Sequence, residues 1–312
     1  MTSPSYSVTI AENLARLAWS HWTELGVAGV VRNHQATAID PEALILLTAH
    51  LGDREPRLRD ESIDWCVKNR DAVAVTRLKN LAKQGICDLE RFAAYAKAVN
   101  THGPARWPIP ADVEPLAVRL SGKSRSPDLS RPSLTRLRLR ALFGVGARAE
   151  IVAELLSGSG ADRSAAELSR AGYSKRHIAQ TCDELVDAGL LRRIEVGNQH
   201  RYRLNKPREL QSIFSVDWPV YVPRWTDTIE ILIKLHELAT TGAAQTDGLA
   251  AVSTQRRLRE LRRPLSSVGW TPPVPATPTD LWHTAMTWAV DKSSQCADGP
   301  PDQDDISWVN PF

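Results

Sequence analysis

A helical repeat of apolar residues that runs directly into two alternating segments is the feature that most restricts the fold of this chain. It lies in residues 172–205, which read GYSKRHIAQTCDELVDAGLLRRIEVGNQHRYRLN. The inward positions of its helical part are Ile178, Cys182, Leu185 and Val186. Ser174 is placed to cap this helix and Gly189 to end it. LLRRIEV and HRYRL then alternate as strands do, with GNQ as the turn, so the stretch predicts a helix followed by a β-hairpin.

Two shorter helical patterns precede this stretch. GARAEIVAELLSG places Ile151 and Leu155 on one face, and RSAAELSRAG offers Ser164 as a cap and Leu168 on its inner face. Gly172 then permits a sharp turn into the third helix. The order helix, helix, tight turn, helix and hairpin is the order of elements in a winged helix-turn-helix.

The segment SAAELSRAGYSKRHIAQTCDELVDAGLLRRIEVGNQHRYRL resembles the winged helix-turn-helix DNA-binding domains of bacterial transcriptional regulators. The resemblance extends over residues 142–205 and includes their common ending, in which the helix closes with AGLL and the second strand with YRL. It implies a central domain of three helices plus a β-hairpin that binds double-stranded DNA. Winged helices also serve as protein-binding modules, and the sequence leaves that alternative open.

The start of the third helix is the best candidate for contact with DNA. A helix N-terminus offers free N–H groups and the positive end of the helix dipole to a phosphate. Ser174, Lys175 and Arg176 stand at this end, and His177 follows them. We expect Lys175 and Arg176 to bond guanine edges or phosphates, and Gln180, one turn further on, to pair with adenine.

The predicted hairpin supplies the remaining candidate contacts of the central domain. These are Arg192, Arg193, Asn198, His200, Arg201 and Arg203. Phosphate contacts made by the hairpin arginines would not depend on base sequence. Asp183, Glu184 and Asp187 lie on the second half of the preceding helix and would repel phosphates. The prediction is therefore that only about the first turn of that helix faces the groove.

Basic residues are concentrated in the middle of the chain. The whole sequence has a net charge of +3, which is too small to indicate a partner. Residues 116–150 hold eight basic residues against two acidic ones, a net charge of +6, whereas residues 291–312 carry a net charge of −4. In the basic segment Arg136, Arg138 and Arg140 alternate with leucines. We expect the leucines to be buried and the three arginines to form an exposed ridge that contacts DNA.

Helical periodicity on both sides of the central domain predicts a mainly α protein. Asp40 followed by Pro41 is a strong helix start in the first part, and four prolines in HGPARWPIPADVEP mark its end. The predicted organisation is a helical N-terminal domain (1–103), a Pro/Ser-rich basic linker (104–133), the winged helix-turn-helix DNA-binding domain (134–208), a helical C-terminal domain (209–292) and an acidic flexible tail (293–312).

No motif for catalysis or for metal binding is present. The sequence contains no phosphate-binding loop, no G-x-G-x-x-G and no G-x-S-x-G. PDQDDISW carries three carboxylates, but no predicted strand or helix holds them in place. The cysteines include no C-x-x-C pair, and no His/Cys group has zinc-ligand spacing. We therefore expect a protein that is not an enzyme, with no catalytic residue, no metal and no cofactor.

The same sequence features predict a cytoplasmic, nucleoid-associated protein that has no membrane partner. The N-terminal MTSPSYSVTIAENLARLAWSHW lacks the basic start and apolar core of a signal peptide. The longest apolar run, ALILL, is far too short to span a bilayer.

The helical flanks are expected to bind a partner, a signal or a second copy of the chain, as in a homodimer. DPEALILLTAHLGDREPRLRDESIDWCVKNRDAVAVTRLKNL is similar to the helical N-terminal part of prokaryotic winged-helix proteins encoded beside nucleotidyltransferase-like toxins. Two binding functions therefore compete, and an enzyme whose motif is not recognised is a third reading. One is a sequence-specific DNA-binding transcriptional regulator. The other is an antitoxin or autorepressor of a toxin–antitoxin or phage-defence locus, which binds a toxin-like nucleotidyltransferase through its helical flanks.

Overall fold

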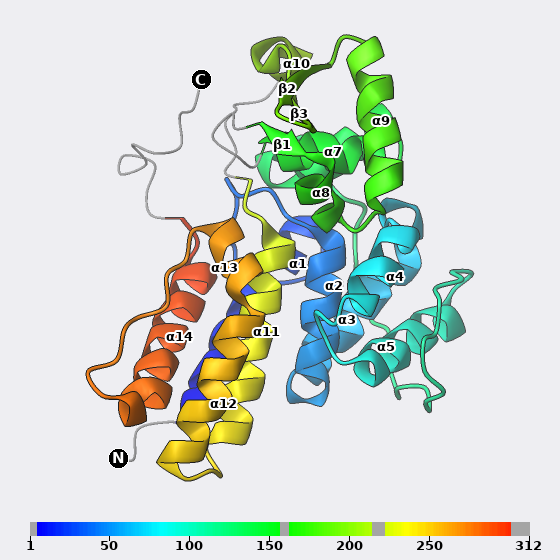
Figure 1. Ribbon diagram of the computed structural model, residues 1–312. Coiled ribbons are helices and arrows are strands. Elements are labelled where there is room, and N and C mark those ends of the chain that lie inside the picture. The colour runs from blue at the N-terminus through cyan, green and yellow to red at the C-terminus, as the bar shows by residue number, and fades with distance from the viewer. Residues whose placement is uncertain (1–4, 157–161, 214–221, 301–312) are drawn as a thin grey trace.

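The structure is a computed structural model that describes residues 5–156, 162–213 and 222–300. It is mainly helical and contains one small three-stranded sheet in the described part (Figure 1). The prediction of a mainly α protein is therefore confirmed. Within the same ranges, no helix has the length and apolar character needed to cross a bilayer.

The first part of the chain forms α1 (Tyr6–Leu25), α2 (Pro41–Leu51), α3 (Pro56–Lys68), α4 (Val75–Lys83) and α5 (Leu89–His102). The start of α2 matches its prediction, since the Asp40 carboxylate accepts a hydrogen bond from the Ala43 N–H at 3.3 Å. Pro41 occupies the first turn, where its fixed φ suits a helix and its missing N–H costs nothing.

The last described part of the chain forms α11 (Trp225–Gly242), α12 (Asp247–Glu260), α13 (Arg262–Val268) and α14 (Leu281–Asp298). Both α11 and α14 pack against α1, and α11 also packs against α2 (Figure 1). One hydrophobic core includes Trp22 of α1, Trp65 of α3, Ile229 of α11 and Met286 of α14. The sequence predicts separate N-terminal and C-terminal helical domains, whereas these helices share one core. We call α1–α5 with α11–α14 the helical body.

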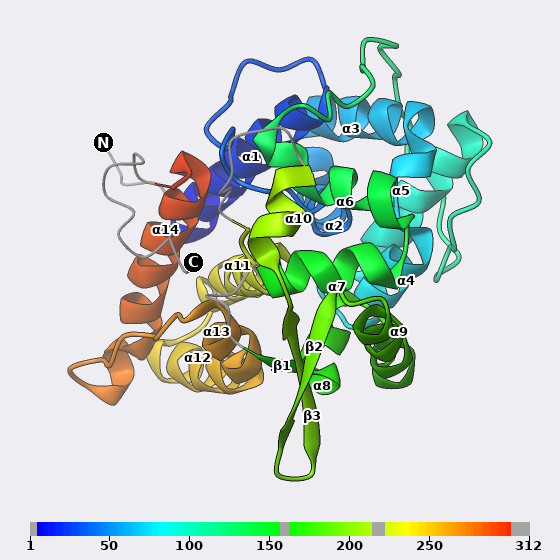
Figure 2. The same cartoon turned by 90° about the horizontal axis from the view of Figure 1, so that it is seen from above.

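A second core belongs to the central segment, which we call the helix–hairpin unit. It consists of α7 (Ala147–Leu156), β1 (Arg163–Ser164), α8 (Ala165–Leu168), α9 (Lys175–Asp187), β2 (Leu191–Val196), β3 (Gln199–Leu204) and α10 (Pro207–Ile213). The sheet order is β1-β3-β2, and all pairs are antiparallel. Leu191 pairs with Leu204 and Val196 with Gln199, which confirms the predicted hairpin. The hairpin projects away from the rest of the chain (Figure 2).

Helix α6 (Thr135–Phe143) joins the two cores. Leu137 packs in the core of the helical body, and Leu139, two residues later, packs in the core of the helix–hairpin unit. These positions lie on different sides of a helix, so one short helix contributes an apolar side chain to each core. The position of the helix–hairpin unit is therefore set by packing as well as by the chain connection.

The predicted linker and the predicted tail are both partly held in place. Ser124 in the linker is buried, and its backbone N–H donates to Asp64 of α3 at 3.1 Å. The Lys68 Nζ donates to the Ser124 carbonyl at 2.6 Å. Residues 293–298 of the predicted tail belong to α14, where Ser293 and Ala297 are buried, and residues 301–312 lie outside the described residues.

Candidate nucleic-acid interface

The first turn of α9 is exposed and carries uncompensated positive charge. The Ser174 hydroxyl caps the helix by accepting a hydrogen bond from the His177 N–H at 3.2 Å. Ile178 and Cys182 are fully buried, which turns the face that bears Lys175 and Arg176 toward solvent. Neither cation has a hydrogen bond or ion pair with any residue that the structure describes. The turn therefore presents free N–H groups and two cations together.

The second half of α9 is acidic, but its carboxylates are partly paired. Asp183 lies 3.4 Å from Arg193 of the hairpin, and Glu184 lies 2.8 Å from Arg148 of α7. The Gln180 side chain, predicted to pair with adenine, donates to Glu184 at 3.3 Å. Such exposed ion pairs contribute little to stability and exchange readily with other partners. The acidic surface limits the favourable region for a phosphate to the start of the helix.

The candidate residues of the hairpin differ in how free they are. Arg203 pairs with Asp162 at 2.6 Å, and Arg201 is half-buried and pairs with Glu167 at 3.1 Å. Arg192 is exposed and donates only to the neutral Asn205 side chain, at 3.2 Å, among the contacts of the described chain. Asn198 is exposed at the hairpin turn, and His200 is exposed with Glu195 at 3.8 Å. Arg192 is therefore the hairpin arginine with most freedom to meet a phosphate.

The predicted basic ridge is not formed. Arg136 and Arg140 are only 2% and 3% exposed, and Arg138 is half-buried with a hydrogen bond to the Arg131 carbonyl at 2.7 Å. The physical reason is the period of the pattern. Alternate residues share a face in a strand, but in the helix α6 residues 136 and 140 share one face and residue 138 lies on the other. Arg136 and Arg140 are therefore buried and not on the surface, whereas Arg138 is only half-buried.

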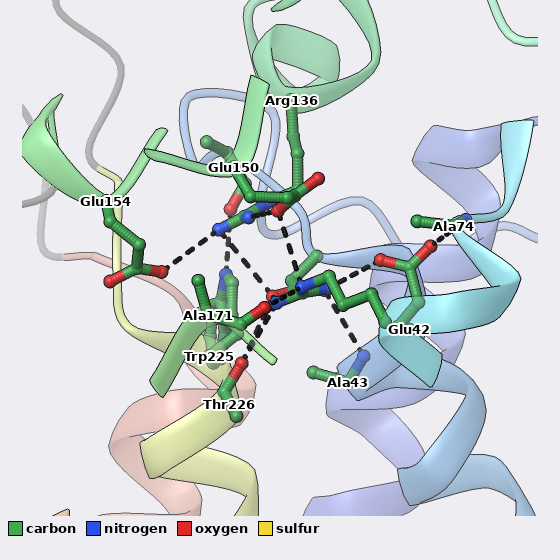
Figure 3. Close-up of polar contacts among 12 residues, drawn as sticks. Glu42, Ala43, Ala74, Arg136, Glu150, Glu154, Ala171, Trp225 and Thr226 are labelled. Atoms are coloured by element: carbon green, nitrogen blue, oxygen red, sulfur yellow. Dashed lines mark hydrogen bonds and ion pairs between the residues drawn. The ribbon is translucent and has the colours of Figure 1, made fainter. Parts of the chain in front are cut away.

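Arg136 and Arg140 belong instead to a buried cluster of charges, and Figure 3 shows Arg136 beside Glu150 in it. We define the arginine–carboxylate cluster as Arg77, Arg136, Arg140, Asp40, Glu42 and Glu150. Arg77 of α4 pairs with Asp40 at 2.6 Å and with Glu42 at 2.5 Å. Arg140 bridges Glu42 at 2.5 Å and Glu150 of α7 at 2.7 Å. Three arginines and three carboxylates thus make up the cluster, and Glu154 lies at its edge, 3.7 Å from Arg136.

Two carboxylates of the cluster, Asp40 and Glu150, remain ionised although they are buried. Burial alone opposes ionisation of Glu150, but Arg140 and Arg136 beside it lower its pKa to about 2. Burial also opposes ionisation of Asp40, but Arg136 and Arg77 beside it hold its pKa well below its usual range. Desolvating such charges is costly, and their mutual attraction offsets the cost only when every partner is present. The cluster is therefore sensitive to the loss of any one member.

The cluster also fixes the entry to α9. The Arg77 Nε donates to the Ala171 carbonyl at 2.7 Å, and the neighbouring Asn80 side chain donates to the Gly172 carbonyl at 2.8 Å. Figure 1 shows α4 beside the N-terminal end of α9. Two exposed cations of α4, Lys79 and Lys83, are thus carried by the helix that holds this turn. Sequence reasoning missed them, because nothing local relates residues 75–83 to residues 172–176.

No metal cluster or disulfide is found in the part of the chain that the structure describes. No group of three or more His, Cys, Asp or Glu side chains there could hold a metal ion, and all four cysteines are free. No known protein family, curated protein or solved structure matches this chain. The case for a function therefore depends on the geometry of the residues described above.

Proposed function

We propose that the protein is a sequence-specific DNA-binding transcriptional regulator that uses the helix–hairpin unit as a winged helix-turn-helix. The observation that supports this best is the exposed first turn of α9. There Ser174 caps the helix, and Lys175 and Arg176 have no partner among the described residues. A helix start of this kind attracts phosphate and places side chains at base edges when it enters a major groove.

In this proposal the start of α9 contacts bases, whereas the hairpin and α4 contact phosphates. Lys175 and Arg176 read base edges, because the start of a recognition helix reaches deepest into the groove. Arg192 of the hairpin, with Lys79 and Lys83 of α4, contacts phosphates and contributes affinity that is independent of sequence. The acidic second half of α9 stays away from the phosphate backbone of the DNA, and this restricts the angle at which the helix enters the major groove.

The test is a DNA-binding measurement on a charge-removal variant and a matched control. DNA fragments are first selected from a randomised pool by the wild-type protein. Lys175→Ala with Arg176→Ala is expected to abolish preference for the selected sequence, while circular dichroism and thermal melting remain unchanged. The control, Arg256→Ala with Arg259→Ala, removes the same charge from exposed positions on α12 and should bind as the wild type does.

Three outcomes would contradict the proposal. In the first, the wild-type protein selects no sequence from the pool. In the second, the α9 variant binds the selected fragment with unchanged affinity and unchanged dependence on salt. The third is a change in affinity of the α9 variant that is no larger than that of the control, which would show that α9 does not contact the DNA.

An antitoxin or autorepressor is the second candidate function, and one feature of the helical body favours it. Leu249 and Val252 on α12 are 61% and 65% exposed, and Val274 in the segment that follows α13 is 91% exposed. Val252, Leu258 and Pro275 line an apolar groove of about 540 Å³ at this place. Exposed apolar patches of this kind often mark protein interaction sites.

Co-purification from the native host separates the two functions. A bound nucleotidyltransferase-like protein that is lost in Val252→Asp, with DNA binding retained, supports the antitoxin. Recovery of a second copy of this chain alone supports a regulator that dimerises.

A further inference from the structure

A second candidate binding site lies at the end of α2 that is remote from the arginine–carboxylate cluster. It is a pocket of about 380 Å³ between the end of α2, the start of α5 and residues 113–116. Asp40 caps one end of α2 within the cluster, and Leu51 at the other end lines the pocket. Neither α9 nor the hairpin contributes to the lining.

The polar part of the pocket wall is rich in arginine. Arg54 is exposed and has no hydrogen bond or ion pair with any described residue. Arg91 donates to the backbone carbonyl of His50 at 2.5 Å, which leaves its positive charge uncompensated. Arg59 is 8% exposed and is held by Asp60 at 2.9 Å. Glu90 is the only carboxylate among the described lining residues, so the wall carries an excess of positive charge.

Two histidines behind the pocket respond to this charge. The pKa of His50 falls to about 3, first because of burial and then because of His236, Arg91, Lys234 and Arg54. The pKa of His236 falls to about 4, first because of burial and then because of Arg54 and Arg91. After burial, the charges of Arg54 and Arg91 therefore act on His50, near the end of α2, and on His236 within α11.

The rest of the wall is apolar and partly aromatic. It is formed by Ala49, Leu51, Ala94, Tyr95, Val113 and Leu116. Pockets that bind small molecules combine such a wall with a few polar groups, and this volume is at the low end of their range. The planar guanidinium of arginine matches a carboxylate or a phosphate through two parallel hydrogen bonds.

We propose that this pocket binds a small organic anion, a carboxylate or phosphate monoester that bears an apolar or aromatic group. The anionic group contacts Arg54 and Arg91, and the apolar group lies against the partly exposed Ala94 and Leu116. The proposal does not depend on DNA binding, because no residue of α9 or the hairpin is involved.

Calorimetric titration of the full chain with three probes tests the proposal. Phenyl phosphate and phenylacetate carry the two anionic groups, and benzyl alcohol is the neutral counterpart. At least one anionic probe is expected to bind saturably at one site, with no binding of benzyl alcohol. Arg54→Gln and Arg91→Gln should each weaken binding about tenfold or more, as expected for the loss of one charged hydrogen bond. Arg256→Gln, at an exposed site on α12, should leave it unchanged.

Absence of saturable binding by both anionic probes would overturn the proposal, and so would equal binding of benzyl alcohol. Unchanged affinity in Arg54→Gln would also overturn it. That variant is informative even if Arg91→Gln does not fold, since the Arg54 side chain is exposed and has no hydrogen bond or ion pair with any described residue. Because the titration contains no DNA, its result is separate from that of the DNA-binding test.

Discussion

Arg77 of α4 donates a hydrogen bond from Nε to the carbonyl oxygen of Ala171 at 2.7 Å, across 94 positions of the sequence. The same guanidinium pairs with Asp40 and Glu42 at the start of α2. One fully buried side chain therefore connects the helical body to the turn that leads into α9. The orientation of the candidate recognition helix depends on a charge that sequence reasoning assigned no role.

Removing this charge is expected to be strongly destabilising. Arg77→Met leaves Asp40 and Glu42 buried with too few partners, and the loss of one member of a buried ion pair costs about 3–5 kcal/mol. Chemical denaturation followed by circular dichroism measures the change in the free energy of unfolding. Lys79→Met, at an exposed position on the same helix, is the control and should change it by less than about 0.5 kcal/mol.

The double variant Arg77→Met with Glu42→Gln tests whether charge balance is the cause. It leaves two arginines facing two carboxylates, so it should be more stable than Arg77→Met alone. If the second substitution brings no recovery, packing of the arginine side chain rather than its charge explains the loss.

Gly172 is expected to tolerate no side chain. It has a φ of +96°, and a Cβ there would lie 2.9 Å from the Cγ of Arg77 and 3.3 Å from Leu81. Gly189 has a φ of +75° with no atom within 4 Å of such a Cβ. Gly189→Ala should therefore cost only the backbone strain, about 1 kcal/mol. Gly172→Ala should cost about 1–3 kcal/mol more, as crowding in a packed interior does.

Thermal melting of the two glycine variants side by side measures that difference. Equal losses would mean that α4 and the turn before α9 separate easily. The packing of Arg77 against Gly172 would then not hold the helix–hairpin unit.

Stability should decrease as the pH falls from 7 to 5. His34, His50 and His236 are buried, and their pKa values lie near 4, 3 and 4, first because of burial. In the unfolded chain each takes up a proton near pH 6.5. Below that pH the unfolded chain binds these protons and the folded protein does not. Stability therefore decreases from about pH 6.5 down to the pKa values of the folded state. Each buried histidine accounts for about 2 kcal/mol at pH 5.

Denaturation curves at several pH values measure the slope of stability against pH. His236→Gln should reduce this slope between pH 5 and 6, whereas His283→Gln, which removes an exposed imidazole, is the matched control. His236 is hydrogen-bonded to His50 at 2.7 Å, and a slope that stays the same in His236→Gln would contradict a buried, neutral His236.

The hairpin should contribute affinity for DNA without preference for sequence, provided that the proposed function holds. Arg192→Gln removes an exposed charge with no acidic partner among the described residues. It should weaken binding to selected and random fragments equally and lower the slope of log K against log salt by about 1. Fluorescence anisotropy at several salt concentrations gives both values. A loss confined to the selected fragment would place Arg192 at a base edge instead.

Local features of the structure were predictable from neighbouring residues. Asp40 and Ser174 cap their helices as expected, because a cap depends on residues within a single turn. The buried stripe of α9 and the hairpin likewise follow from periods that can be read over a few residues. The charged residues were harder to place, and Arg136 and Arg140 show why. A solvated ridge and a buried cluster have the same local sequence, and they differ only in whether carboxylates from other segments meet the arginines.

The sequence by itself determined a mainly helical chain, the caps and periods of its central helices, and a hairpin after α9. Only the tertiary structure decided that α1 packs with α11 and α14 in one core, and that Arg77, Arg136 and Arg140 meet Asp40, Glu42 and Glu150. The physical reason is the distance along the sequence over which the interactions act. Helix and strand patterns reflect interactions between residues a few positions apart. Burying a charge is possible only where distant segments bring its partners to the same place.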